Sequence, residues 1–139
     1  MISNSFKTLA LAVVLGFAPM SHVAADDTPL AEQMEVVSKS LKLLRRAETN
    51  ADKVVLVQKA QVATLKGLEF VPDSFKNIKD KDALAKATAD YKRLTGLAYV
   101  GLCELEMAFL AGDEDKADDA IDKLKDLKKE GHKAYKSED

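Results

Sequence analysis

The chain has 139 residues, with 21 Lys and Arg, 23 Asp and Glu, and a formal net charge of −2 at pH 7. This near-neutral balance gives no electrostatic footprint for nucleic acid or for an anionic membrane. Cys103 is the only cysteine, so an intramolecular disulfide is excluded and stability must come from packing.

Residues 1–25 have the features of a cleaved signal peptide. Lys7 precedes a short apolar run, residues 9–17, and the small residues 23–25 suit cleavage. The run is too short for a comfortable transmembrane helix, so we expect export to the periplasm without stable membrane insertion. The mature domain is then residues 26–139, with a net charge of −3 because Lys7 is removed and no acid is lost.

The first expected helix covers residues 28–48. Thr28 can cap its free backbone N–H groups, and Pro29 suits its first turn. One face carries apolar residues at alternating steps of four and three: Leu30, Met34, Val37, Leu41 and Leu44. Met34 is either a flexible core filler or a thioether ligand that points into a bundle.

Three more helices are expected, over residues 50–70, 82–111 and 114–136. Pro72 and a polar loop, residues 75–80, separate the second from the third. Gly112 ends the third helix and Asp113 can cap the fourth. With no convincing strand pattern and short connections, the sequence predicts an all-α protein, an antiparallel up-down-up-down four-helix bundle.

The third helix is apolar almost all round from Leu94 to Leu110, interrupted by Glu104 and Glu106. Such a helix is buried on more than one side. We consider a homodimer contact and, as the simpler alternative, a thick core with ordinary exposed apolar residues. Within this helix, Cys103 is expected to be a buried, inert thiol and Met107 a core filler.

His132 is the only histidine of the mature chain, since His22 leaves with the signal peptide. By itself, a histidine near a helix C-terminus is usually a surface residue that complements the helix dipole. In an up-down-up-down bundle, however, the start of the first helix and the end of the fourth share one end. Met34 and His132 then lie about 6–8 Å below that end, at about 1.5 Å per residue, and can face each other across the core.

A Met–His pair suits a low-spin haem iron, whose reduction potential the thioether raises. No CxxCH motif is present, so the haem would be noncovalent. One His and one Met do not make a structural zinc site, and copper would need another ligand. The acidic residues fit solvated helix faces rather than catalytic pairs, so we expect no enzyme activity.

On these residues the chain resembles the soluble cytochrome b562 family, which are periplasmic b-type cytochromes. The resemblance rests on residues 30–48 (LAEQMEVVSKSLKLLRRAE) and on residues 132–136 (HKAYK). It implies one noncovalent haem b with Met34 and His132 as axial ligands, and electron transfer with an unidentified redox partner. The alternative is a haem-free periplasmic bundle of the same fold that acts as a binding or stress-related interaction protein.

The resemblance also implies the residues around the haem. Leu30 and Val37 flank Met34 in the apolar stripe, and Tyr91 is the one aromatic residue at the level where the family has phenylalanines. Lys128 and Lys136 stand where the family has arginines near the haem edge, and each can meet a propionate as a point charge.

Overall fold

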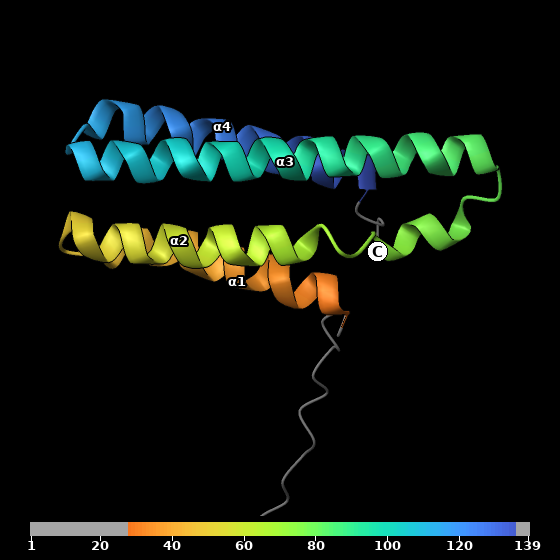
Figure 1. The fold of residues 1–139 in the computed structure, drawn as a ribbon, viewed down its shortest axis with the longest axis horizontal. Coiled ribbons are helices and arrows are strands. Elements are labelled where there is room, and N and C mark those ends of the chain that lie inside the picture. The colour runs from red at the N-terminus through yellow and green to blue at the C-terminus, as the bar shows by residue number, and fades with distance from the viewer. Residues whose placement is uncertain (1–27, 136–139) are drawn as a thin grey trace, which may run out of the picture.

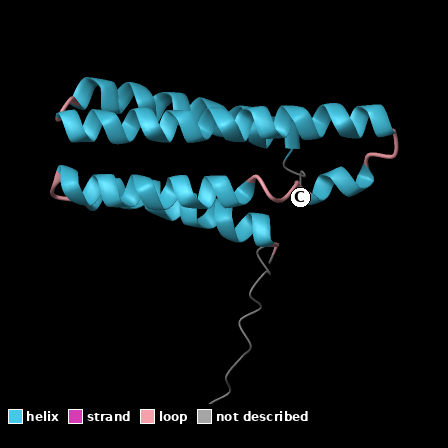
Figure 2. Ribbon diagram, in the orientation of Figure 1, coloured by secondary structure: helices cyan, strands magenta, loops and turns pink. Residues whose placement is uncertain are grey.

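The computed structural model describes residues 28–135, and this part of the chain is all-α (Figure 2). The expected signal peptide and Lys136 therefore lie outside the described residues. Four α-helices and two short 3-10 helices follow one another: α1 (Pro29–Leu43), η1 (Leu44–Arg46), α2 (Asn50–Gly67), η2 (Asp73–Asn77), α3 (Lys81–Ala111) and α4 (Glu114–Tyr135). Between residues 28 and 135 there is no strand.

Side chains cap the helices as the sequence predicts. The Ala31 N–H donates to Thr28 Oγ1 (3.1 Å), and Pro29 occupies the first turn of α1. Gly112 ends α3 with a φ of +67°, which a side chain would disfavour. The Lys116 N–H donates to Asp113 Oδ1 (3.0 Å) at the start of α4.

The first two helices end earlier than expected. α1 stops at Leu43 and tightens into η1, because Ala47 must be extended to bring Thr49 to the start of α2. There the Asp52 N–H donates to Thr49 Oγ1 (3.1 Å). α2 stops at Gly67, and a further turn closes residues 68–70.

Consecutive helices pack on one another: α1 on α2, α2 on α3, and α3 on α4. Within the described part of the chain, no comparable contact joins α1 to α4. Figure 1 shows the α1–α2 pair below the α3–α4 pair. The loop that joins α1 to α2 and the loop that joins α3 to α4 both lie at the left-hand end of this view. We call this end the connection end, and the opposite end, where α1 begins and α4 ends, the open end.

The main hydrophobic core lies toward the connection end. Val57 of α2 and Leu105 of α3 are fully buried there. Val37 and Leu41 of α1 are partly buried against this cluster. Its buried members are Leu44, Val57, Ala60, Leu102, Leu105, Ala108, Phe109, Ala117, Ala120 and Leu124. Small alanines at these contacts let the helix backbones approach closely.

Three expectations about single side chains were wrong. Phe75, expected in a polar loop, is 4% exposed within η2. Met107, expected in the core, is 69% exposed, and Cys103 is only partly buried. α3 turns Leu102 and Leu105 inward, so residues 103 and 107 face outward. A helix that is apolar all round does not reveal its buried face from sequence periodicity.

By length and composition α3 could also cross a membrane, with a mean hydropathy of 1.4 over its apolar window. Of that window, 39% is buried inside this structure. Core helices of soluble proteins share this property, so the composition of α3 alone identifies neither environment.

Candidate functional site

Met34 lies in the second turn of α1 and packs on α2. Its side chain is 39% exposed. A Cβ atom built on Gly67 would lie 3.0 Å from Met34 Cε and 3.6 Å from Leu30 Cδ1. Gly67 therefore provides the space that the Met34 methyl group occupies. Leu30 and Val37, the neighbours of Met34 in the stripe, are both partly buried.

His132 lies in the last turn of α4, and Lys128 lies one turn earlier; both are exposed. Met34 and His132 thus lie on α1 and α4, which are not consecutive and share no extensive contact. Figure 1 shows the start of α1 and the end of α4 toward the same end of the molecule. Met34, however, is turned toward Gly67 of α2.

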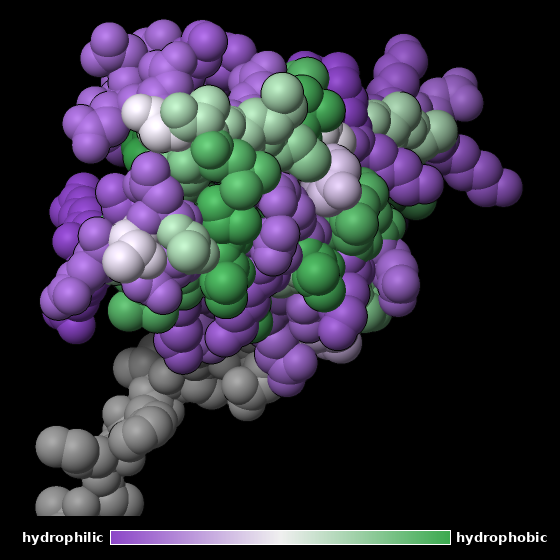
Figure 3. Space-filling model, turned by 60° about the vertical axis from the view of Figure 1, so that its left-hand side comes forward, coloured by the Kyte–Doolittle hydropathy of each residue, from purple (hydrophilic) through white to green (hydrophobic). Residues whose placement is uncertain are grey.

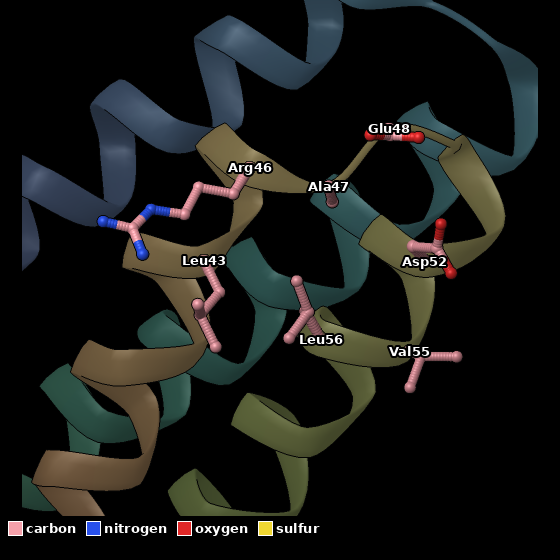
Figure 4. A pocket seen from close by; sticks show the side chains of 7 residues that line it. All are labelled: Leu43, Arg46, Ala47, Glu48, Asp52, Val55 and Leu56. Atoms are coloured by element: carbon pink, nitrogen blue, oxygen red, sulfur yellow. The ribbon is translucent and has the colours of Figure 1, made fainter.

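Two open hollows lie on the surface, and neither is lined by Met34 or His132. One, of about 470 Å³, lies at the α1–α2 connection between Leu43, Arg46 and Val55 (Figure 4). The other, of about 440 Å³, lies beside the start of α1 and includes Leu30 and Phe70. Both are shallow features of the surface rather than enclosed sites.

Tyr91 belongs to an aromatic cluster at the open end. Its ring meets Phe75 of η2 at 6.2 Å between centroids and Tyr135 of α4 at 6.1 Å. Phe75 and Tyr135 are 5.3 Å apart. All three pairs are edge-to-face, the favourable arrangement for aromatic rings. The Ser74 hydroxyl also donates to the Tyr135 carbonyl (2.9 Å), which ties η2 to the end of α4.

A polar network covers the outer side of this cluster. The Tyr135 hydroxyl donates to Asp90, and Arg93 bridges Asp90 (2.8 Å) and Glu130 (3.0 Å). The hydrogen bonds from Tyr135 and Arg93 hold the pKa of Asp90 below its usual value. Burial, helped by the bond to Asp90, raises the pKa of Tyr135 to about 12.

The Tyr91 hydroxyl differs from that of Tyr135, because it is buried without a hydrogen-bond partner among the described residues. The Tyr91 side chain is 9% exposed, and burial raises its pKa. Thr95 lowers the pKa of Tyr91 and so offsets part of the effect of burial. The Thr95 hydroxyl nevertheless donates to the backbone carbonyl of Tyr91 (2.9 Å), so it does not serve as a partner for the Tyr91 hydroxyl. An unpaired buried hydroxyl costs about 1–3 kcal/mol, so this group is poised for a partner.

Sequence reasoning selected Tyr91 by its level along the third helix. It missed Phe75, because a single aromatic residue after Pro72 carries no periodic signal. It also missed Gly67, whose role depends on how α1 and α2 meet.

Within residues 28–135, no group of three or more His, Cys, Asp or Glu side chains is arranged to hold a metal ion. No protein-family model matches the chain, and a search of curated proteins found no match.

Proposed function

We propose that the chain is a periplasmic electron-transfer protein of the cytochrome b562 type. In this proposal residues 26–139 form an antiparallel up-down-up-down four-helix bundle that follows a cleaved signal peptide. The bundle binds one noncovalent haem b, with Met34 and His132 as the axial ligands.

One observation supports the proposal most strongly. The bundle's single histidine and one of its methionines lie toward the same end, on α1 and α4, between which no extensive contact is found. A flat cofactor between two helices requires them to stand apart, because direct contact would occupy the same volume. The consecutive helix pairs are in contact and leave no such separation.

The surrounding side chains fit a flat, largely apolar group with a polar edge. Leu30 and Val37 supply apolar contacts beside Met34, and Tyr91 supplies an unpaired hydroxyl. Lys128 is exposed one turn from His132, where its ammonium group can meet a carboxylate. Bound haem would supply one-electron chemistry at iron, and ligands on both faces leave no position for a substrate.

Met34 must move to serve as a ligand. Its methyl group lies against Gly67, whereas the proposed partner is on α4. Methionine has three rotatable side-chain bonds, so rotation can carry the sulfur away from α2 without a backbone change.

Spectroscopy of the purified protein tests the proposal. With hemin added, we expect a six-coordinate low-spin spectrum that Met34→Ala and His132→Ala abolish. Met107→Ala is the matched control, because Met107 is exposed on α3 near the connection end. A protein that rejects hemin, or a low-spin spectrum that depends on Met107, would contradict the proposal.

Thermal unfolding gives a second test. Haem binds only the folded bundle, so saturating hemin should raise the melting temperature well above that of the haem-free protein. Equal melting temperatures would favour the second candidate, a haem-free binding module, which the exposed apolar side of α2 and α3 also suits.

A further inference from the structure

Exposed apolar residues are concentrated on α2 and α3. Ten large apolar side chains of the described residues are exposed, and seven of them lie on these two helices: Val55, Val62, Leu65, Leu97, Val100, Met107 and Leu110. Their exposed fractions are 43–69%. Single exposed apolar residues are ordinary, but a large contiguous apolar patch marks an interaction surface.

The outward side of α3 has the spacing of a coiled-coil seam. Apolar or small residues recur at alternating steps of four and three, without a charged member: Gly96, Val100, Cys103, Met107 and Leu110. This is the heptad spacing with which one helix packs along another. Within residues 28–135 no helix covers Val100, Met107 and Leu110 of this seam, since all three are exposed.

α2 extends the same surface. The Gln58 and Gln61 side-chain amides donate to Glu106 of α3 (2.7 and 2.6 Å), so the two helices lie side by side there. Val62 and Leu65 follow on the exposed side of α2. Figure 3 shows several groups of apolar (green) side chains among hydrophilic (purple) ones on one side of the molecule. We call the surface formed by Val62, Leu65 and the α3 seam the α2–α3 face.

The acids beside the seam already have partners within the chain. Glu106 accepts both glutamine amides, and these hydrogen bonds hold its pKa below the usual value. Glu104 pairs with Lys123 of α4 (3.0 Å). A second protein surface can therefore approach without leaving either carboxylate unpaired, whereas hydrocarbon around Glu106 would strip water from a charge at high cost.

The seam is complementary to itself in the antiparallel direction. A two-fold axis near Cys103 places Gly96 opposite Leu110 of a second copy and Val100 opposite Met107. Gly96 has open space above it, with no atom within 4 Å of where a Cβ would lie. The largest gap in the seam thus meets one of its long side chains, which is the match that a symmetric dimer requires.

The available area suits a weak dimer. A fully exposed Val, Leu or Met side chain offers on the order of 100 Å² of apolar surface, so the five exposed ones of the α2–α3 face, at somewhat over half exposure, supply about 250–300 Å². A standard interface takes about 800 Å² from each partner, of which about 65% is apolar in homodimers. The face therefore supplies about half of the apolar area of a standard interface, as a weak dimer requires.

We propose that the α2–α3 face binds a second copy of this chain in an antiparallel, two-fold dimer along the α3 seam. The face lies on α2 and α3, whereas the proposed haem ligands lie on α1 and α4. The dimer therefore leaves the open end accessible. Dimerisation and haem binding can be tested independently of each other.

Sedimentation equilibrium of the mature chain, over a wide concentration range without hemin, tests the proposal. We expect a dimer that dissociates on dilution. Gly96→Leu should weaken it about tenfold or more, because the new side chain meets Leu110 of the second copy. Gly131→Leu is the matched control, since position 131 is also open but lies on α4, and it should leave the dimer intact.

Two further measurements complete the test. Met107→Lys, at an exposed position that tolerates charge within one chain, should also dissociate the dimer, with circular dichroism confirming the fold. Vesicles of anionic and zwitterionic lipid should not pellet the protein. A monomer at the highest concentration, a dimer unchanged by both seam variants, or a monomer that pellets with vesicles would overturn the proposal.

Discussion

The two ends of this molecule differ in how completely they are packed. At the connection end, Val57 and Leu105 are fully buried among side chains from three helices and η1. At the open end, Met34 remains partly exposed and the Tyr91 hydroxyl is buried without a partner. Stability is therefore concentrated at one end, and the other end carries the unsatisfied groups that functional sites commonly retain.

Truncation at the connection end should have the largest effect on stability. Leu105→Ala removes a fully buried side chain, so we expect a loss of about 2–5 kcal/mol in the free energy of unfolding. Met107→Ala, two residues away but exposed, should change it by about 0.5 kcal/mol or less. Urea unfolding measured at low protein concentration compares them, and similar losses would contradict the assigned faces of α3.

At the open end, Tyr91→Phe should be stabilising. The change removes a buried hydroxyl that has no partner and keeps the ring contacts with Phe75 and Tyr135. We expect the haem-free protein to gain about 1 kcal/mol, from the cost of about 1–3 kcal/mol of an unpaired group. Tyr135→Phe is the contrasting variant, because its hydroxyl is bonded to Asp90 and its loss should destabilise.

A loss of stability on Tyr91→Phe would show that the hydroxyl has a partner in solution. The same variant with hemin bound sharpens the comparison. If the hydroxyl meets the ligand, its removal should reduce hemin affinity while raising the stability of the haem-free protein.

Gly67→Ala tests the contact between Met34 and α2. Alanine favours a helix over glycine by about 0.5–1 kcal/mol, but at position 67 its Cβ crowds the Met34 methyl group at 3.0 Å. Gly131→Ala meets no atom within 4 Å and should show the helix gain alone. In thermal unfolding we therefore expect Gly67→Ala to raise the melting temperature less than Gly131→Ala does. Only Gly67→Ala should also change the proposed low-spin spectrum. Equal gains would mean that Met34 does not rest there.

The Tyr135–Asp90 hydrogen bond should give the smallest effect, visible at high pH. Folding raises the pKa of Tyr135 to about 12, so the neutral phenol is favoured in the folded state. Its contribution is complete below the unfolded pKa of about 10 and is lost as pH rises toward about 12. Thermal unfolding between these values should show a steeper decline for the natural protein than for Tyr135→Phe.

The stability of the protein at low pH tests Asp90, the acceptor of the same hydrogen bond. The pKa of Asp90 is lowered on folding, so its contribution is present above the unfolded value near 4 and fades as pH falls through the folded value. Parallel stability curves for the natural protein and Tyr135→Phe at both extremes of pH would contradict this hydrogen bond.

The helix ends show where sequence-based prediction succeeds and where it stops. The Thr28 cap, the Gly112 stop and the Asp113 cap were predicted correctly, because each depends on a few neighbouring residues. The ends of α1 and α2 were placed too late. The chain leaves each helix where it must turn toward the next element, and this position does not follow from local helix propensity. The haem, its two ligands and the periplasmic location stay predictions.

The sequence by itself determined that the described chain is all-α and where most of its helices begin, since helix periodicity and capping are local properties. Only the tertiary structure decided which side of α3 is buried, because a helix that is apolar all round is ambiguous until its neighbours pack against it. It also decided that Phe75 joins Tyr91 and Tyr135, and that Met34 rests on Gly67. These contacts join residues far apart in the chain, and the mutual fit of helices, not local propensity, selects them.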